Sequence, residues 1–407
     1  MGARIPTEIV VIGGGLLGWS TAYRLAKSGR QVTVIERGEP GAATLAGAGI
    51  IAPAASLTMG ETLLALGKRA VDYYHRLIPE LGADGETETG YATPGLLFVA
   101  RDEEEFTRLP AVRDLIAGRQ AAGIGNVGEI EMIDGAAAKA RFPALADVPG
   151  AIWLSGAARV NGRQLRAALQ RAAEQHGAEI MLGDAQLIRA GERIVDVNVG
   201  SQRLAPEIVV IAGGAWSNAL GDSIGVAIPL YPQRGQIVHF DLPGVKTGDW
   251  PIVQGFSTHY ILTFPDNRVV AGATREHDSG YELRLTAGGI QSVLNDALRV
   301  APGLANATIA EIRIGLRPFS PDGLPMIGNI SGLANVYLNT GHGPSGLTLG
   351  PVSGALVAAL INGEPPGIDL APYLVERYAN DALPPEQRSG RDERETIARG
   401  SGDDVFG

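Results

Sequence analysis

The chain has 407 residues and a formal net charge of −10, with 45% hydrophobic and 19% charged residues. This composition is that of a globular protein, and the acidic balance leaves no basic face for nucleic acid, so we expect no nucleic-acid partner. Because the chain has no cysteine, disulfides, thiolate metal sites and cysteine nucleophiles are excluded. The six histidines show no metal-ligand spacing, so we expect no metal site.

The N-terminal segment predicts a βαβ unit. Residues 8–12 form a short apolar run rich in β-branched side chains, typical of a strand that is buried on both faces. Three glycines interrupt this run, and residues 16–27 then have a helical pattern. Residues 31–35 form a second strand that Glu36 closes.

Further elements follow in chain order. The predicted helices are 60–81, 164–176, 285–300 and 345–361. The predicted strands are 95–99, 151–154, 179–182, 204–211, 235–240, 259–264, 268–271, 311–316 and 336–339. We expect 95–99 and 151–154 to be strands of a second, antiparallel sheet. We interpret 346–361 as a buried helix, because a spanning helix needs about 20 apolar residues. After about residue 384 the chain is polar without periodicity, which predicts a flexible tail.

The first chemical motif is Gly13-x-Gly15-x-x-Gly18, directly after a strand and at the start of a helix. Gly13 turns the chain, Gly15 lets the backbone approach a pyrophosphate, and Gly18 lets the helix pack on the strand. Glu36, about 20 residues further on, is placed to bind ribose hydroxyls. The alternative is a glycine-rich turn in an unrelated fold, which this full context disfavours. The motif does not separate FAD from NAD.

The second motif is Gly341-His342-Gly343, which leads into the helix that begins at Ser345. A helix start built from small residues can lie against a planar ring. Its N–H groups and dipole would stabilise the negative charge of a reduced flavin. The alternative is an ordinary buried helix with a glycine-rich start.

Two side chains are candidates for substrate binding. Arg317 presents a fork of donors suited to a carboxylate, in an otherwise apolar strand. A structural ion pair, for example with Asp322, is an equally good interpretation of Arg317. Tyr260 lies in a strand of the β-rich segment, where a tyrosine is more often a packing residue.

At these residues the sequence resembles the D-amino-acid oxidase family of flavoproteins, which includes glycine oxidase, sarcosine oxidase and bacterial D-amino-acid dehydrogenases. The resemblance runs through most of the chain. It is carried by the first motif with Glu36, the stretch Ala46 to Pro53, Ala212-Gly213-Gly214-Ala215-Trp216, Gly315-Leu316-Arg317-Pro318, Asp322-Gly323-Leu324-Pro325 with Ile327-Gly328, and Gly341-His342-Gly343.

The resemblance implies an α/β fold in which a Rossmann-type FAD-binding domain carries an inserted α+β substrate domain built on an antiparallel sheet. The predicted FAD-binding domain comprises 1–90, 145–225 and 310–383, and the predicted substrate domain comprises 91–144 and 226–309. Residues 384–407 form the predicted tail. Without cysteine the flavin cannot be attached through a thioether, so we expect FAD to be bound non-covalently.

The resemblance also implies site residues. Arg317 matches the family's carboxylate-binding arginine, and Tyr260 falls where glycine oxidase-like members carry a substrate-side tyrosine. The predicted cofactor-binding residues are Gly13, Gly15, Leu16, Leu17, Gly18, Glu36, Arg37, Ala46, Gly47, Ala48, Ala212, Gly213, Trp216, Gly341, His342, Gly343, Gly346, Leu347 and Thr348.

The function that the resemblance implies is oxidation of a small amino acid or amine by hydride transfer to FAD, with O2 or a quinone or other carrier as the electron acceptor. An NAD-dependent dehydrogenase, a flavin-binding subunit of a larger amine dehydrogenase and a non-enzymatic binding module are the alternatives. The expected location is the cytoplasm, or the membrane surface if a quinone is the acceptor. A homo-oligomer or a partner subunit is compatible with the sequence.

Overall fold

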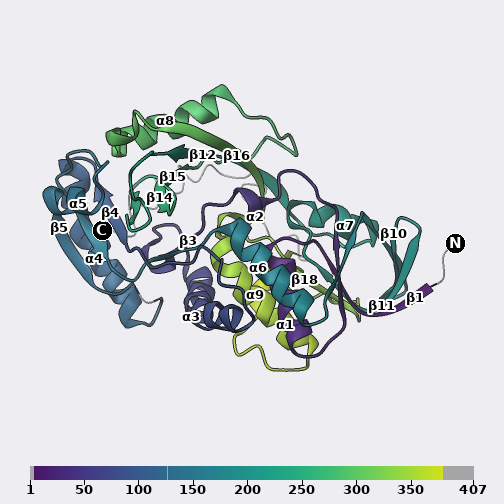
Figure 1. The fold of residues 1–407 in the computed structure, drawn as a ribbon. Coiled ribbons are helices and arrows are strands. Elements are labelled where there is room, and N and C mark those ends of the chain that lie inside the picture. The colour runs from purple at the N-terminus through teal and green to yellow at the C-terminus, as the bar shows by residue number, and fades with distance from the viewer. Residues whose placement is uncertain (1–3, 126, 379–407) are drawn as a thin grey trace.

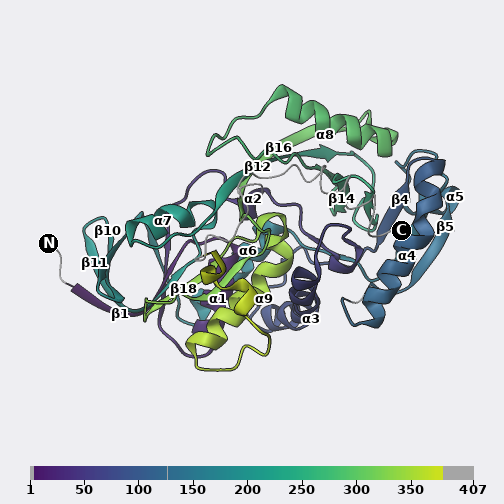
Figure 2. The ribbon, with the colours of Figure 1, turned by 180° about the vertical axis from the view of Figure 1, so that it is seen from behind.

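The computed structural model describes residues 4–125 and 127–378. Within these residues the chain forms two large sheets and a small two-stranded one. Figures 1 and 2 show the two large sheets at opposite sides of the molecule, with α1, α3, α6 and α9 gathered between them. The elements of the first sheet come from the start, middle and end of the chain.

The first sheet has the Rossmann-type arrangement. Its central strands β1, β2, β8, β11 and β18 pair in parallel, while β17 pairs antiparallel with β18 and the β9–β10 hairpin extends from β11. The strands are β1 (Arg4–Ile12), β2 (Val32–Glu36), β8 (Glu179–Leu182), β9 (Ala185–Ala190), β10 (Arg193–Val199), β11 (Gln202–Ile211), β17 (Met326–Asn329) and β18 (Val336–Thr340).

Both faces of this sheet are covered, as the apolar run at 8–12 predicts. Ile9 and Val11 pack into a core with the helices α1 (Leu16–Lys27), α3 (Glu61–Ala83), α6 (Gly162–Gln175) and α9 (Gly346–Ile361). Val10 and Ile12 pack into a second core on the opposite face, with the β9–β10 hairpin. Residues 343–361 are apolar and long enough to cross a membrane by composition, but 67% of that window is buried inside the protein.

The second sheet is antiparallel except where β13 and β4 run parallel. Its strands, in spatial order, are β16 (Thr308–Phe319), β12 (Tyr231–Asp241), β15 (Arg268–Gly272), β14 (Tyr260–Phe264), β13 (Ile252–Gly255), β4 (Leu96–Ala100), β6 (Gly150–Leu154) and β5 (Ile130–Asp134). Helix α4 (Glu103–Ala121) packs on one face of this sheet. Helices α5 (Gly135–Arg141) and α8 (Ala287–Val300) pack on the other.

Short elements connect the two large sheets. They are α2 (Ala43–Ala46), α7 (Ser217–Ser223), the paired strands β3 (Ile50–Ile51) and β7 (Ala158–Arg159), and the 3-10 turns η1 (Pro53–Ala55), η2 (Gly214–Trp216), η3 (Pro302–Leu304), η4 (Gly343–Ser345), η5 (Ala371–Tyr373) and η6 (Val375–Tyr378). Among them, η2 and α7 lie where the chain crosses from β11 of the first sheet to β12 of the second.

The structure confirms the predicted fold class. β6 pairs with β4 and β5, so the strand at 151–154 belongs to the second sheet, as predicted, although it lies within the predicted FAD-binding segment 145–225. β16 pairs with β12 and also belongs to the second sheet, although its residues lie within the predicted FAD-binding segment 310–383. The partner of β16 is distant in sequence, and the apolar pattern of β16 does not reveal which sheet it joins. The other domain limits stay predictions, and the predicted tail 384–407 lies outside the described residues.

Candidate active site

A cavity of about 590 Å³ lies between the two sheets. The start of α1, the segment from 42 to 53, the end of β11, strand β16 and the start of α9 all contribute to its wall. Gly18 and Gly341 are the two predicted site residues that do not line it. The predicted residues that do line it are Gly13, Gly15, Leu16, Leu17, Glu36, Arg37, Ala46, Gly47, Ala48, Ala212, Gly213, Trp216, Tyr260, Arg317, His342, Gly343, Gly346, Leu347 and Thr348.

The three motif glycines have different surroundings. Gly13 has a φ of +108°, and a Cβ there would lie 2.4 Å from the carbonyl oxygen of Ala212. A Cβ on Gly18 would lie 1.8 Å from the carbonyl oxygen of Gly13. Gly18 therefore brings α1 against the strand and stays outside the cavity. A Cβ on Gly15 would meet only Thr44 Oγ1, at 3.5 Å, so Gly15 leaves space on the cavity side.

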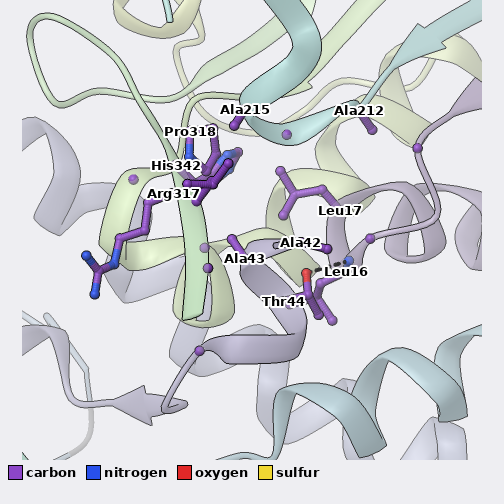
Figure 3. Close-up of a pocket in the computed structure, with 18 of the residues that line it drawn as sticks. Leu16, Leu17, Ala42, Ala43, Thr44, Ala212, Ala215, Arg317, Pro318 and His342 are labelled. Carbon is purple, nitrogen blue, oxygen red and sulfur yellow. Dashed lines mark hydrogen bonds between the residues drawn. The ribbon is translucent and has the colours of Figure 1, made fainter. Parts of the chain in front are cut away.

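The N-terminus of α1 opens into the cavity. Gly15 is its N-cap and has no side chain that could cap the helix, and the first turn carries no acidic residue. The Leu16 N–H donates to Thr44 Oγ1 at 3.1 Å, and Figure 3 shows these two residues facing each other. Thr44 was not predicted as a site residue, because no motif marks it. A helix N-terminus whose N-cap residue is glycine is suited to phosphate, because its N–H groups and dipole both favour an anion.

Glu36 lies beside this glycine turn. Its Oε2 accepts a hydrogen bond from the Gly14 N–H at 2.8 Å, and its Oε1 accepts one from the Gly38 N–H at 2.6 Å. The Arg37 guanidinium stacks over the Trp216 ring at 5.5 Å from its centroid. The predicted ribose-binding carboxylate and the loop after β11 are thus brought together at one end of the cavity.

The segment around 46–50 packs tightly against the start of α9. A Cβ on Gly47 would lie 2.6 Å from Leu347 Cδ1, so a larger residue at this position would push the Leu347 side chain aside. Thr348 Oγ1 donates to the Ile50 carbonyl at 2.8 Å, and the Tyr74 hydroxyl donates to the Leu347 carbonyl at 2.5 Å. These contacts fix the two walls of the cavity relative to each other.

The segment that leads into α9 lines the cavity with backbone groups and with an uncharged histidine, His342. The helix has no side-chain cap and no acidic residue in its first turn. His342 is buried, and its Nε2 lies 2.8 Å from Ser353 Oγ, which itself donates to the Leu349 carbonyl. His342 Nε2 therefore donates to Ser353. Burial lowers the pKa of His342 to about 3, so the ring is uncharged near neutral pH.

Arg317 lies at the other end of the cavity, on β16. Its Nη1 donates to Gln233 Oε1 and to the Thr274 carbonyl, both at 3.0 Å. A Cβ on Gly235 would lie 2.5 Å from Arg317 Nη2, so the guanidinium occupies the space above this glycine. Figure 3 shows Arg317 extending away from Leu16 and Thr44. Asp322, the alternative partner of Arg317, binds Arg377 at 2.7 Å instead.

Tyr260 begins β14 and lies against Gly272, where a Cβ would be 2.8 Å from its hydroxyl oxygen. Burial raises the pKa of the Tyr260 phenol, while the charges of Arg317 and Arg275 oppose that shift. The phenol therefore stays protonated and can donate a hydrogen bond. Gln254 and Arg275 line the same end of the cavity. Sequence reasoning missed both, because neither lies in a motif.

Within the described residues no three His, Asp or Glu side chains gather into a group that could hold a metal ion. The site is instead two connected regions. One is a glycine-lined region with two uncapped helix starts, and the other is a cationic region beneath the second sheet. This arrangement can hold an extended dinucleotide with a small anion beside it.

Comparison with known proteins agrees with this geometry. Residues 8–360 match the family described as DAO, FAD-dependent oxidoreductase. The chain is 40% identical to the oxidoreductase YurR of Bacillus subtilis, over 89% of this chain and 97% of YurR. It is 32% identical to the glycine oxidase of Pseudomonas aeruginosa, over 90% and 98% of the two chains. Its structure is similar to that of an iminodiacetate oxidase from Chelativorans, with a TM-score of 0.87 and 38% identity over 90% and 98% of the two chains.

Proposed function

The chain belongs to the DAO family of FAD-dependent oxidoreductases, and we propose that it oxidises a D-amino acid, glycine or an N-alkyl glycine at the bond between the α-carbon and nitrogen. The family and its glycine oxidase relatives make the protein an FAD-dependent enzyme that acts on small amino-acid-like amines. The observation that carries the finer proposal is the single cavity that joins the glycine motif to Arg317 and Tyr260.

The residues present fit FAD. Gly15 leaves open the space that a Cβ would fill, next to a helix N-terminus with no side-chain cap. The cavity volume of about 590 Å³ is within the range of sites that bind small molecules and cofactors. FAD, when bound, supplies the acceptor for the hydride that leaves the substrate α-carbon. The start of α9 would stabilise negative charge that develops at the ring.

Arg317 would hold the substrate carboxylate. Hydrogen bonds from its Nη1 to Gln233 and to the Thr274 carbonyl fix the plane of the guanidinium fork for bidentate carboxylate binding. The protonated Tyr260 hydroxyl would donate to the same group. With the carboxylate fixed and the amine uncharged, hydride transfer depends on positioning rather than on a strong base. The imino acid then reacts with water to give an oxo acid and ammonia or an amine.

The experiment that tests this proposal is the substitution Arg317→Ala, with Tyr260→Phe as a milder change. We expect Arg317→Ala to raise the apparent KM for carboxylate substrates at least tenfold, because charge-assisted hydrogen bonds are worth roughly 1.5–3 kcal/mol each. FAD content should not change. An unchanged KM in a folded, yellow Arg317→Ala protein would overturn the role of Arg317.

The electron acceptor and assembly belong to the same proposal. Because the chain belongs to an FAD-dependent family, the NAD-dependent dehydrogenase that the first motif left open is excluded. We propose O2 or a quinone or carrier as the acceptor and the cytoplasm as the location, and a partner subunit or homo-oligomer stays an open prediction. Admitting air to the substrate-reduced protein distinguishes the acceptors, because an oxidase regains its colour at once.

A further inference from the structure

A second arginine faces the same end of the cavity as Arg317. Arg275 follows β15 and lines the cavity together with Arg317, Tyr260 and Gln254. The acidic side chains among the described lining residues are Glu36, Glu39 and Asp184. Glu36 ends β2, and Glu39 and Asp184 lie in the loops that follow β2 and β8, so all three are at the dinucleotide end. The region beneath the second sheet is therefore where the cationic lining residues are concentrated.

The backbone register places Arg275 beside the Arg317 guanidinium. Thr274 N–H donates to the Gln236 carbonyl at 3.2 Å, and Arg234 and Glu276 exchange backbone hydrogen bonds of 2.9 and 3.0 Å. Arg275 is thus directly opposite Gly235 on β12. Residues directly opposite on antiparallel strands project on the same face. Since the Arg317 guanidinium lies above Gly235, the two arginines converge over this one glycine.

The residues on either side hold Arg275 in place. Thr274 accepts from Arg317 through its carbonyl and donates from its hydroxyl to Glu276 Oε1 at 2.8 Å. Glu276 also accepts from Gln236 Nε2 at 2.7 Å and from Arg234 Nη2 at 2.5 Å. A backbone anchored at both neighbours presents its side chain in a defined position, as a binding site requires.

We propose that Arg275 binds a second carboxylate, so that the preferred substrate is an amine carrying two carboxylates, with the carboxylate next to the reacting carbon on Arg317. This inference rests on the proposed function and narrows its substrate class. Arg275 and Arg317 come from the two chain segments that flank β12 and lie on the same face beside Gly235, and this concentration of positive charge favours a dianionic substrate. The oxidation itself is unchanged: hydride leaves the α-carbon for FAD, a proton leaves the nitrogen, and water converts the imine into an oxo acid and an amine.

The test compares two probes that differ by one carboxylate, sarcosine and iminodiacetate. Anaerobic flavin reduction of the holoprotein is followed against the concentration of each probe. We expect wild-type protein to bind iminodiacetate at least tenfold more tightly than sarcosine. Arg275→Gln should weaken iminodiacetate at least tenfold and change sarcosine less than about twofold, because one charge-assisted contact is lost. Arg275→Lys should restore part of the difference.

Arg284→Gln is the matched control, because Arg284 lies on the same connecting segment with 65% of its side chain exposed and binds Glu282. It should leave both probes unchanged. A readout without turnover is the rise in unfolding temperature caused by malonate relative to acetate, which Arg275→Gln should abolish.

Equal weakening of both probes by Arg275→Gln would show that the two arginines share one carboxylate, and no weakening would show that Arg275 does not contact substrate. Either result overturns the inference. These results differ from those expected if the proposed function itself is wrong, because then neither probe nor any other amino acid would reduce the flavin of the wild-type protein.

Discussion

Gly235→Ala should displace the guanidinium of Arg317, the proposed carboxylate ligand, while Arg317 itself is unchanged in sequence. The new Cβ would lie 2.5 to 2.7 Å from the guanidinium atoms of Arg317, whereas ordinary contact begins at 3.4 Å. The guanidinium is the far end of a flexible side chain, so it moves by about 0.9 Å and loses good geometry toward Gln233 and Thr274. A misplacement of about 1 Å can cost about 100-fold in rate. We therefore expect kcat/KM to fall about 10- to 100-fold, or about 1.4–2.7 kcal/mol.

Steady-state kinetics with the best amino acid substrate measure this loss, and FAD content and unfolding temperature report whether the fold is intact. Gly288→Ala is the matched control, because a Cβ at Gly288 in α8 meets nothing within 4 Å. It should leave the kinetics unchanged. If Gly235→Ala keeps kcat/KM within twofold of wild type in a folded, yellow protein, the position of the guanidinium does not limit substrate binding and the reasoning is refuted.

Three further results are expected. Gly15→Ala should lower FAD affinity at least tenfold, because its Cβ would occupy space on the cavity side. The unfolding temperature of the FAD-free protein should stay unchanged, because within the protein this Cβ meets only Thr44 Oγ1, at 3.5 Å. Unchanged FAD affinity would contradict the phosphate site. Acid precipitation should release all yellow colour into the supernatant, and colour retained in the pellet would contradict non-covalent binding. Burial lowers the pKa of His239 to about 3 from 6.5, so as the pH falls His239 becomes protonated in the unfolded chain before it does in the folded chain. The free energy of unfolding should therefore decrease by about 1.4 kcal/mol per pH unit as the pH drops from about 6.5 toward 3. The free energy of unfolding of His239→Leu, measured with urea at several pH values in this range, should depend less steeply on pH than that of wild type. An identical pH dependence would exclude His239 as the group responsible.

The local parts of the fold could be predicted from the sequence. The helix at 16–27 and the strand at 179–182 have the predicted bounds, because glycines and apolar runs mark their ends. The long helix α4 was missed, although Asp102 caps it by accepting from the Glu105 N–H at 2.9 Å. That capping pattern is visible in the sequence and could have located the helix start.

The candidate site was only partly predictable. The cofactor end consists of motifs contiguous in sequence, so its residues could be named. Gln233 and Arg275 reach the substrate end through pairing between β12, β16 and the segment after β15, and no local pattern records such pairing. The same kind of long-range pairing decides that β16 joins the second sheet. The pairing of Asp322 with Arg377 likewise depends on contacts between residues distant in sequence, so the sequence alone could not name the partner of Asp322.

The most direct test of the central claim is an anaerobic single turnover. Purified holoprotein is mixed with glycine, sarcosine, iminodiacetate and a set of D-amino acids, and flavin absorbance and oxo acid are measured together. The account predicts that one class bleaches the flavin and that one oxo acid forms for each flavin reduced. A yellow protein that none of these amines bleaches would contradict amino acid oxidation as the activity of this chain.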